Sequence, residues 1–229
     1  MRGRSLSPRT ESDRLEAGVP SCLIGLMKAY RDGWNWQIGT IREVTWVANG
    51  TTDDTSITGA IPPVFEAYAT FYEPDEISTV EHERAVVNQL VEFTPDQPWW
   101  LGYLDTGAHS VVFDDVPTVT LYSSWHYVLI AAGPEQALTW RTGHMRAAYG
   151  VLPDLFFPED RSWLVAALWD DTWTCIGGPH TLIEALHQDP LVQAQRVRLG
   201  ANAKPPGRDR DYETPGEVNP RMPLWYSDT

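Results

Sequence analysis

The sequence lacks the signatures by which most enzyme and metal-binding families are recognised. It contains no HExxH, no CxxC, no G-x-S-x-G, no G-x-x-x-x-G-K-[ST], and no G-x-G-x-x-G after a predicted strand. These motifs carry zinc ligands, nucleophiles and phosphate-binding loops. Their absence predicts no metal site and no cofactor, so function has to be sought in charge, aromatic content and fold.

Long apolar runs and cysteines are also scarce. No apolar run approaches the roughly 20 residues that a membrane-spanning helix needs. The N-terminus has no apolar stretch typical of a secretory signal. Only Cys22 and Cys175 are present, far apart and in apolar surroundings. We therefore expect buried, reduced thiols and a cytoplasmic protein, with a single disulfide as the alternative.

Positive charge is in deficit, and the deficit is unevenly distributed. The chain has 17 Lys and Arg against 31 Asp and Glu, a formal net charge of −14. Residues 1–20 hold four arginines and three acids, and residues 200–229 hold four bases and five acids, so the excess acid lies between them. Such a body repels nucleic acid and anionic membranes and attracts a basic protein or a cation. Acidity that only maintains solubility is the alternative.

The two ends differ from the middle of the chain. Residues 1–20 have no apolar period, and residues 200–229 are rich in proline and charge, so neither buries enough apolar surface to offset the entropy of ordering. We expect a flexible N-terminal tail (1–20), a single domain (21–199) and a Pro-rich C-terminal tail (200–229). Within that tail, Leu224, Trp225 and Tyr226 are apolar enough to dock on the body or on a neighbour.

The domain mixes helix and strand patterns. Helical spacing of apolar residues predicts helices over 21–32, 80–91, 134–140 and 179–187. β-branched and aromatic enrichment between turn residues predicts strands at 34–39, 41–47, 65–71, 99–107, 109–116, 118–125, 126–133, 163–169, 173–176 and, at an edge, 192–199. Because hairpins outnumber βαβ units, we predict an α+β fold: a mainly antiparallel sheet with a few packed helices and disordered or loosely docked tails.

Two pairs of aspartates are the candidate binding residues. Asp170 and Asp171 are predicted at a hairpin turn between Trp169 and Trp173, where carboxylates beside aromatic side chains can hold a cation or a basic side chain. Asp114 and Asp115 stand in a similar position before Val116-Pro117. The alternative is that these aspartates only satisfy backbone donors in their turns.

The six histidines form no recognisable ligand set. Glu81, His82 and Glu83 are consecutive on a predicted helix, so their side chains diverge, and we expect a solvated helix face. An enzyme, for example a hydrolase, remains the rival class, because a catalytic site is defined by geometry and not by order in the chain. His109, His126, His144 and Asp105 are the residues to examine for such a site, with a structural role for His126 as the alternative.

One stretch carries a family resemblance. Residues 158–166, PEDRSWLVA, are followed by Trp173-Thr174-Cys175-Ile176-Gly177-Gly178 and preceded by residues 61–69, IPPVFEAYA. This arrangement resembles a group of uncharacterised acidic proteins from actinobacteria, which combine a P-x-D-R-x-W strand with a T-x-x-G-G turn before a helix. In type it is also similar to the acidic α+β proteins of the Smi1/Knr4-like immunity superfamily, some of which neutralise toxins.

The sequence therefore predicts a non-enzymatic, acidic, cytoplasmic binding protein, immunity-like or antitoxin-like, that masks a basic partner such as a toxin. We expect neither nucleic acid nor a membrane as partner. The sequence also predicts the positions of two side chains. Trp163 should be buried, and Arg161 should lie at the sheet margin with its stem over aromatic surface and its head paired with a carboxylate.

Overall fold

The computed structural model describes residues 27–73, 76–105, 113, 115–142, 150–168 and 172–205. Its centre is a sheet of ten strands in the order β1-β2-β6-β4-β7-β8-β9-β3-β10, with β5 also paired to β6. Every pairing is antiparallel. The strands are β1 (Lys28–Arg31), β2 (Trp34–Ile38), β3 (Ala67–Phe71), β4 (Trp99–Leu104), β5 (Val119–Leu121), β6 (Trp125–Ala132), β7 (Leu155–Pro158), β8 (Leu164–Ala166), β9 (Thr174–Gly178) and β10 (Gln195–Val197).

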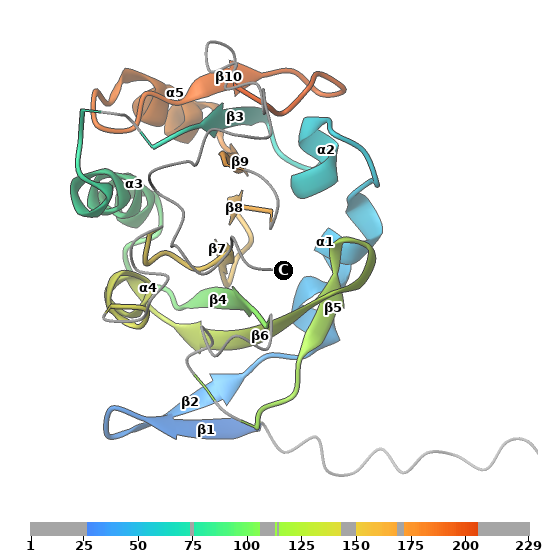
Figure 1. Ribbon diagram of the computed structural model, residues 1–229, viewed down its shortest axis with the longest axis vertical. Helices are drawn as coiled ribbons and strands as arrows, with labels where there is room; N and C mark the ends of the chain where they lie inside the picture. Colours follow the sequence, from blue (N-terminus) through green and yellow to red (C-terminus); the bar gives the residue numbers. More distant parts are fainter. Residues whose placement is uncertain are drawn as a thin grey trace, which may run out of the picture.

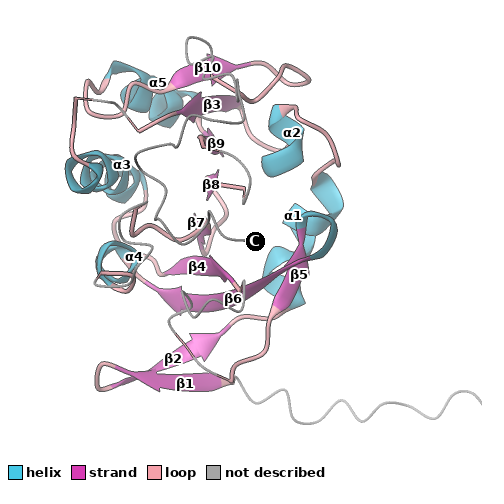
Figure 2. Cartoon of the chain, in the orientation of Figure 1, coloured by secondary structure: helices cyan, strands magenta, loops and turns pink. Residues whose placement is uncertain are grey.

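Five helices cover the two faces of this sheet (Figures 1 and 2). In the described chain they are α1 (Ile41–Gly50), α2 (Ile57–Ala60), α3 (Thr79–Phe93), α4 (Pro134–Thr139) and α5 (His180–Gln188). Figure 1 places α3, α4 and α5 on one side of the strands and α1 and α2 on the other. The prediction of an α+β fold with a mainly antiparallel sheet is confirmed. Among the described residues, none of the helices combines the length and apolar character that crossing a bilayer requires.

Each face of the sheet has its own hydrophobic core, because strand side chains alternate between faces. Trp163 and Val165 of the β8 segment join the core under α3, α4 and α5, which we call the α3 face. Their neighbours Leu164 and Ala166 join the core under α1 and α2, the α1 face. Trp163 is fully buried, as expected. Its indole N–H donates to Oγ1 of Thr94 at 3.3 Å, and so does the indole of Trp99.

Two predicted elements have the wrong type. Residues 28–31, predicted as helix, form strand β1, because Asp32 and Gly33 both adopt positive φ (52° and 82°) and turn the chain into the β1–β2 hairpin. Residues 41–47, predicted as strand, form helix α1. Thr40 and Glu43 make a capping box that starts this helix, and Val44 and Val47 then share its buried side.

The other correction concerns a strand that the sequence pattern did not indicate. Strand β7, LFFP, lies fully buried at the centre of the sheet and pairs with β4 and β8. Its residues are continuously apolar, so period-2 alternation gave no signal there. Beyond residue 199 the described chain still contacts the body: Ala203 is buried, and its N–H donates to the carbonyl of Thr55 at 3.0 Å.

Candidate functional site

Most of the predicted aspartate site lies outside the described residues. Asp114, Asp170 and Asp171 are among the residues that the structure does not describe. Asp115 is described and exposed, with a positive φ of 55°. Phe113, two residues earlier in the chain, packs edge-on against Trp140 with a centroid distance of 5.2 Å and belongs to the α3-face core. Asp115 therefore lies beside this core.

The described chain contains four histidines, His82, His126, His180 and His187. The rings of His82 and His187 are each tied to a backbone carbonyl, that of Leu191 at 2.7 Å and that of Ala194 at 2.8 Å. His126 is exposed at the start of β6, with Nδ1 3.4 Å from Oγ1 of Thr120. His109 and His144 lie outside the described residues.

His126 and Asp105 nevertheless come together. The β4–β6 register continues past Leu104 and Tyr127, and the N–H of Asp105 donates to the carbonyl of His126 at 2.8 Å. Residues directly opposite on antiparallel strands present their side chains on the same face. The structure thus brings two of the four examined residues side by side, at an exposed sheet margin and not among the lining residues of either groove described below.

The expectation of a solvated face for Glu81, His82 and Glu83 is wrong for two of the three. His82 and Glu83 are 5% and 6% exposed, because α3 turns both toward the body, whereas Glu81 caps the helix in solvent. Burial lowers the pKa of His82, against the opposing effect of its bond to Leu191. Burial also raises the pKa of Glu83, although the N–H groups of Leu152 and Val151 oppose this shift.

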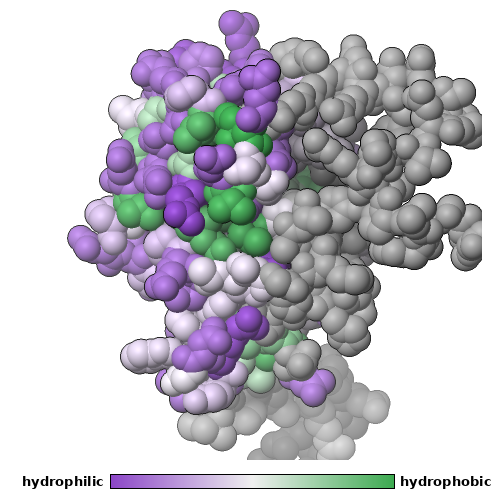
Figure 3. Space-filling view, turned by 60° about the vertical axis from the view of Figure 1, so that its left-hand side comes forward, coloured by the Kyte–Doolittle hydropathy of each residue, from purple (hydrophilic) through white to green (hydrophobic). Residues whose placement is uncertain are grey.

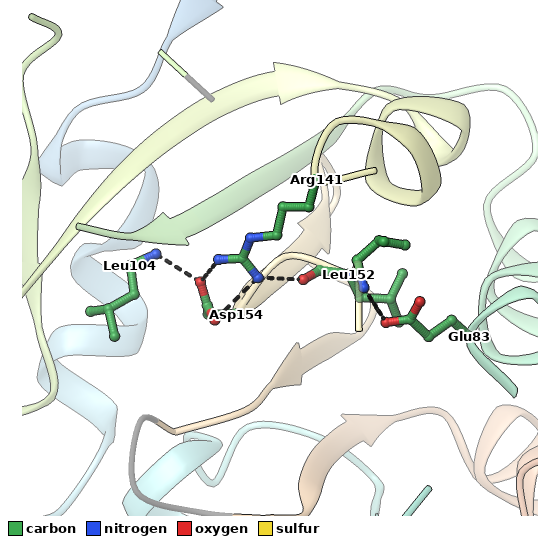
Figure 4. A network of polar contacts seen from close by, with 6 residues as sticks. Glu83, Leu104, Arg141, Leu152 and Asp154 are labelled. Carbon is green, nitrogen blue, oxygen red and sulfur yellow. Dashed lines mark hydrogen bonds and ion pairs between the residues drawn. The ribbon is translucent and has the colours of Figure 1, made fainter. Parts of the chain in front are cut away.

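Glu83 belongs to a buried polar network that Figure 4 shows from close by. Its Oε1 accepts from the N–H groups of Val151 and Leu152 at 2.7 and 3.0 Å. On the other side of the same segment, Arg141 donates to the carbonyl of Leu152 at 2.7 Å and forms an ion pair with Asp154. Asp154 in turn accepts from the N–H of Leu104 at 2.8 Å.

This network holds the chain that leads into β7 and joins it to the end of β4. The guanidinium of Arg141 also lies 5.0 Å from the centroid of the Tyr103 ring, which is fully buried. Within the described chain, the side-chain hydrogen bonds of Glu83 and Arg141 go to backbone groups of residues 151 and 152 or to Asp154, so the network has the form of a structural clamp. No group of three or more His, Cys, Asp or Glu in the described chain is placed to hold a metal.

An acidic surface surrounds the β7–β8 turn. The N–H of Asp160 donates to Oε1 of Gln97 at 2.9 Å, and the N–H of Glu159 donates to the carbonyl of Pro98 at 3.0 Å. These bonds join residues 159 and 160 to residues 97 and 98, which follow Asp96 in the chain. We call Asp96, Glu159 and Asp160 the acidic rim. Partial burial acts to raise the pKa of Asp160, but hydrogen bonds involving Gln97 and Ser162 outweigh it and hold the pKa below its usual value. Asp160 is therefore ionised at neutral pH.

The acidic rim is part of a broader excess of exposed carboxylates. On the side of the molecule that carries α3, α4 and α5, the described residues in view are mainly hydrophilic, with hydrophobic patches between them (Figure 3). The ion pairs between described residues number three, Arg31–Asp32, Arg141–Asp154 and Arg196–Glu184. Several exposed carboxylates therefore form no ion pair with another described residue: Asp53, Asp54, Glu66, Glu76, Glu81, Glu92, Asp96, Asp115, Glu135, Glu159 and Asp160.

Two open grooves lie near the start of α5. The smaller, about 480 Å³, runs between Trp46, Phe65 and Arg161. The larger, about 910 Å³, follows α5, β3 and the edge strand β10. A helix N-terminus can attract an anion, but Oε2 of Glu66 accepts from the N–H of His180 at 3.2 Å, so this position already has its carboxylate.

Comparison of the chain with protein-family models, with curated proteins and with solved structures finds no significant match.

Proposed function

We propose that this protein is a non-enzymatic, acidic binding protein that masks a basic protein partner in the cytoplasm, in the manner of an immunity protein or antitoxin. The observation that carries the proposal is the set of exposed carboxylates without an ion-pair partner among the described residues, in a chain of net charge −14. Such a surface speeds encounter with a positively charged protein and disfavours anionic partners.

Two parts of the surface are the proposed contacts. The first is the acidic rim, whose backbone is held in place by the bonds to Gln97 and Pro98. Its carboxylates are thus presented on an ordered turn, which lowers the entropic cost of binding. The second is the pair Asp170 and Asp171, which precede Trp173 in the sequence, with Asp114 and Asp115 as further candidates from the sequence. Trp173 packs edge-on against Tyr72 at 6.4 Å, which provides the aromatic neighbour that a basic side chain prefers.

The test measures the association rate with a basic protein whose gene lies next to the gene for this chain. Cytochrome c, a basic protein of unrelated shape, is the control. We expect the rate with the true partner to fall steeply with salt, because steering between opposite charges is screened. The variant pair Asp96→Asn with Glu159→Gln should slow association and raise Kd. The matched pair Asp53→Asn with Glu135→Gln changes the net charge equally at exposed positions elsewhere.

The outcomes distinguish a defined contact site from a general effect of the net negative charge. A Kd that rises about tenfold or more for the acidic-rim pair, but not for the matched pair, supports a defined contact. A similar rise in Kd for Asp170→Asn combined with Asp171→Asn supports a contact at that site. Equal, small effects of both matched pairs leave only long-range attraction, and a salt-independent rate overturns the electrostatic proposal.

A hydrolase that uses Asp105 and His126 is the second candidate function. It is favoured by one observation, that these residues lie opposite each other at the ends of β4 and β6, with Thr120 beside the imidazole. An aspartate next to a histidine can orient the ring as a general base. Hydrolysis of p-nitrophenyl acetate that is lost in His126→Asn would support this function. A rate unchanged in that variant would remove it.

A further inference from the structure

The smaller groove combines aromatic walls with one cation. Trp46 packs edge-on against Phe65 and against Phe157, at centroid distances of 6.0 and 5.4 Å. Its indole N–H donates to the carbonyl of Glu43 at 2.9 Å, so the ring is held in one orientation. The volume of about 480 Å³ is in the range of small-molecule sites. The lining residues are Trp46, Val64, Phe65, Glu66, Arg161, Ser162, Gly178 and Pro179.

Arg161 differs from what its acidic surroundings predict. The sequence predicts a carboxylate partner for its guanidinium, but the ion pairs between described residues do not include Arg161. Its guanidinium lies instead 5.7 Å from the centroid of the Trp46 ring. The residue has a positive φ of 58°, which is strained for a side chain other than glycine, and its N–H donates to the carbonyl of Pro158 at 2.9 Å.

The groove lining contains one cation, Arg161, and one carboxylate, Glu66. The carboxylate of Glu66 is engaged with the N–H of His180 at the start of α5. The side chain of Asp160, next in the chain to Arg161, accepts from the N–H of Ser162 at 2.9 Å. The buried hydroxyl of Ser162 has no hydrogen-bond partner among the described residues. A guanidinium over an aromatic ring can still donate its N–H groups to a carboxylate.

We propose that this groove binds a small organic carboxylate with an aromatic body. The carboxylate pairs with the guanidinium of Arg161, and the aromatic body packs against Trp46 and Phe65. Arg161 thus selects for negative charge within an otherwise acidic surface, while the aromatic walls select for an apolar, flat body. None of the acidic-rim residues lines the groove, although Asp160 is the neighbour of Arg161 in the chain. The ligand is tested by itself, without the proposed basic partner.

The experiment uses three probes with the same aromatic ring: 3-phenylpropanoate, the neutral 3-phenylpropanamide and the cationic 2-phenylethylamine. Binding to the full chain is followed by the NMR shift of the Trp46 indole N–H, assigned with Trp46→Phe. We expect saturable binding of the propanoate and a Kd about tenfold or more weaker for the amide, because a charge-assisted hydrogen bond is lost. The amine should produce no saturable shift.

The variant Arg161→Gln should weaken propanoate binding to the level of the amide. The matched control is Arg42→Gln, which removes an exposed arginine on the same helix as Trp46 but outside the lining of the groove. Both variants should unfold near the temperature of the wild type, which shows that a loss of binding is a local effect. Equal binding of the three probes, an unchanged Kd in Arg161→Gln, or no saturable shift up to on the order of 10 mM propanoate would each overturn the proposal.

Discussion

The two faces of the sheet bury different kinds of side chain. The α3 face encloses His82, Glu83 and Arg141 together with its apolar core. The α1 face, under α1 and α2, contains apolar and tyrosine side chains and no buried charged residue of the described chain. Ionisable groups are costly to bury unless they are paired or hydrogen-bonded. The α3 face must therefore use specific polar contacts, and we expect its buried His82 and Glu83 to make its stability depend on pH.

The polar contacts of the α3 face also connect the core to the surface loops. Glu83 and Arg141 hold residues 151–154, and Asp154 reaches across to Leu104 at the end of β4. Loss of one of these side chains should loosen the chain entering β7, whereas loss of an apolar residue on the α1 face should only weaken packing. The following predictions test this difference, from the largest expected effect to the smallest.

The largest effect is expected for Trp163→Ala. This side chain is fully buried and packs edge-on against Trp99 at a centroid distance of 4.9 Å. Its removal should cost about 3–5 kcal/mol of unfolding free energy. Denaturant unfolding followed by circular dichroism measures the loss. A cost below about 1 kcal/mol would mean that the α3-face core is not organised around this residue.

A similar but smaller cost is expected for Arg141→Met. The change leaves the carboxylate of Asp154 without its ion-pair partner at a site where the Arg141 side chain is only 5% exposed, so we expect a loss of about 3 kcal/mol. The control is Arg196→Met, which breaks the exposed pair with Glu184 and should cost less than about 1 kcal/mol. Equal costs in the two unfolding titrations would show that burial does not distinguish these ion pairs.

Two buried threonines, one on each face, provide a matched pair. Thr94 accepts hydrogen bonds from two indole N–H groups on the α3 face, so Thr94→Val should cost roughly 2 kcal/mol. Thr70 lies opposite Cys175, a residue of the α1-face core, and its hydroxyl has no hydrogen-bond partner among the described residues. Thr70→Val should therefore be neutral or stabilising. Thermal melts compare the stability changes of the two valine variants. Thr94→Ser, which retains the hydroxyl, is the control.

The pH dependence of the α3 face is tested by Glu83→Gln. Burial raises the folded-state pKa of Glu83, so the folded protein holds this proton more tightly than the unfolded chain does. Its contribution to stability is then lost as pH rises through the raised pKa. The glutamine keeps a carbonyl acceptor for residues 151 and 152 without the charge. We expect the variant to be more stable than the wild type at pH 7 and this difference to shrink on acidification; a constant difference would contradict the assignment.

The smallest effect is expected for Asp171→Ala. Asp171 is predicted from the sequence to serve binding alone, so its loss should cost less than about 1 kcal/mol, well below the cost of Trp163→Ala. Asp115→Ala, at an exposed position, should behave in the same way. Melting temperatures of these variants decide the point. A cost for Asp171→Ala equal to that of Trp163→Ala would make this aspartate structural and remove it as a candidate contact.

The wrong predictions for α1 and β1 show that capping and turn residues can determine an element type against the hydrophobic pattern. Residues 41–47 are rich in β-branched and aromatic residues, but the Thr40–Glu43 capping box was present in the sequence and marks a helix start. Asp32-Gly33 is the strongest short-range hairpin signal, and it overrides the helical spacing that precedes it. Both elements were therefore predictable, whereas the position of β7 at the centre of the sheet was not.

The sequence by itself determined the α+β class, most strands and helices such as α3 and α5, because side-chain periodicity and turn residues are local properties. It also determined the acidic character of the surface. Only the tertiary structure decided that Glu83 is buried against residues 151 and 152, that Asp105 lies opposite His126, and that Arg161 lies over Trp46. These contacts join residues far apart in the chain, and their geometry follows from strand order and packing, which no local pattern encodes.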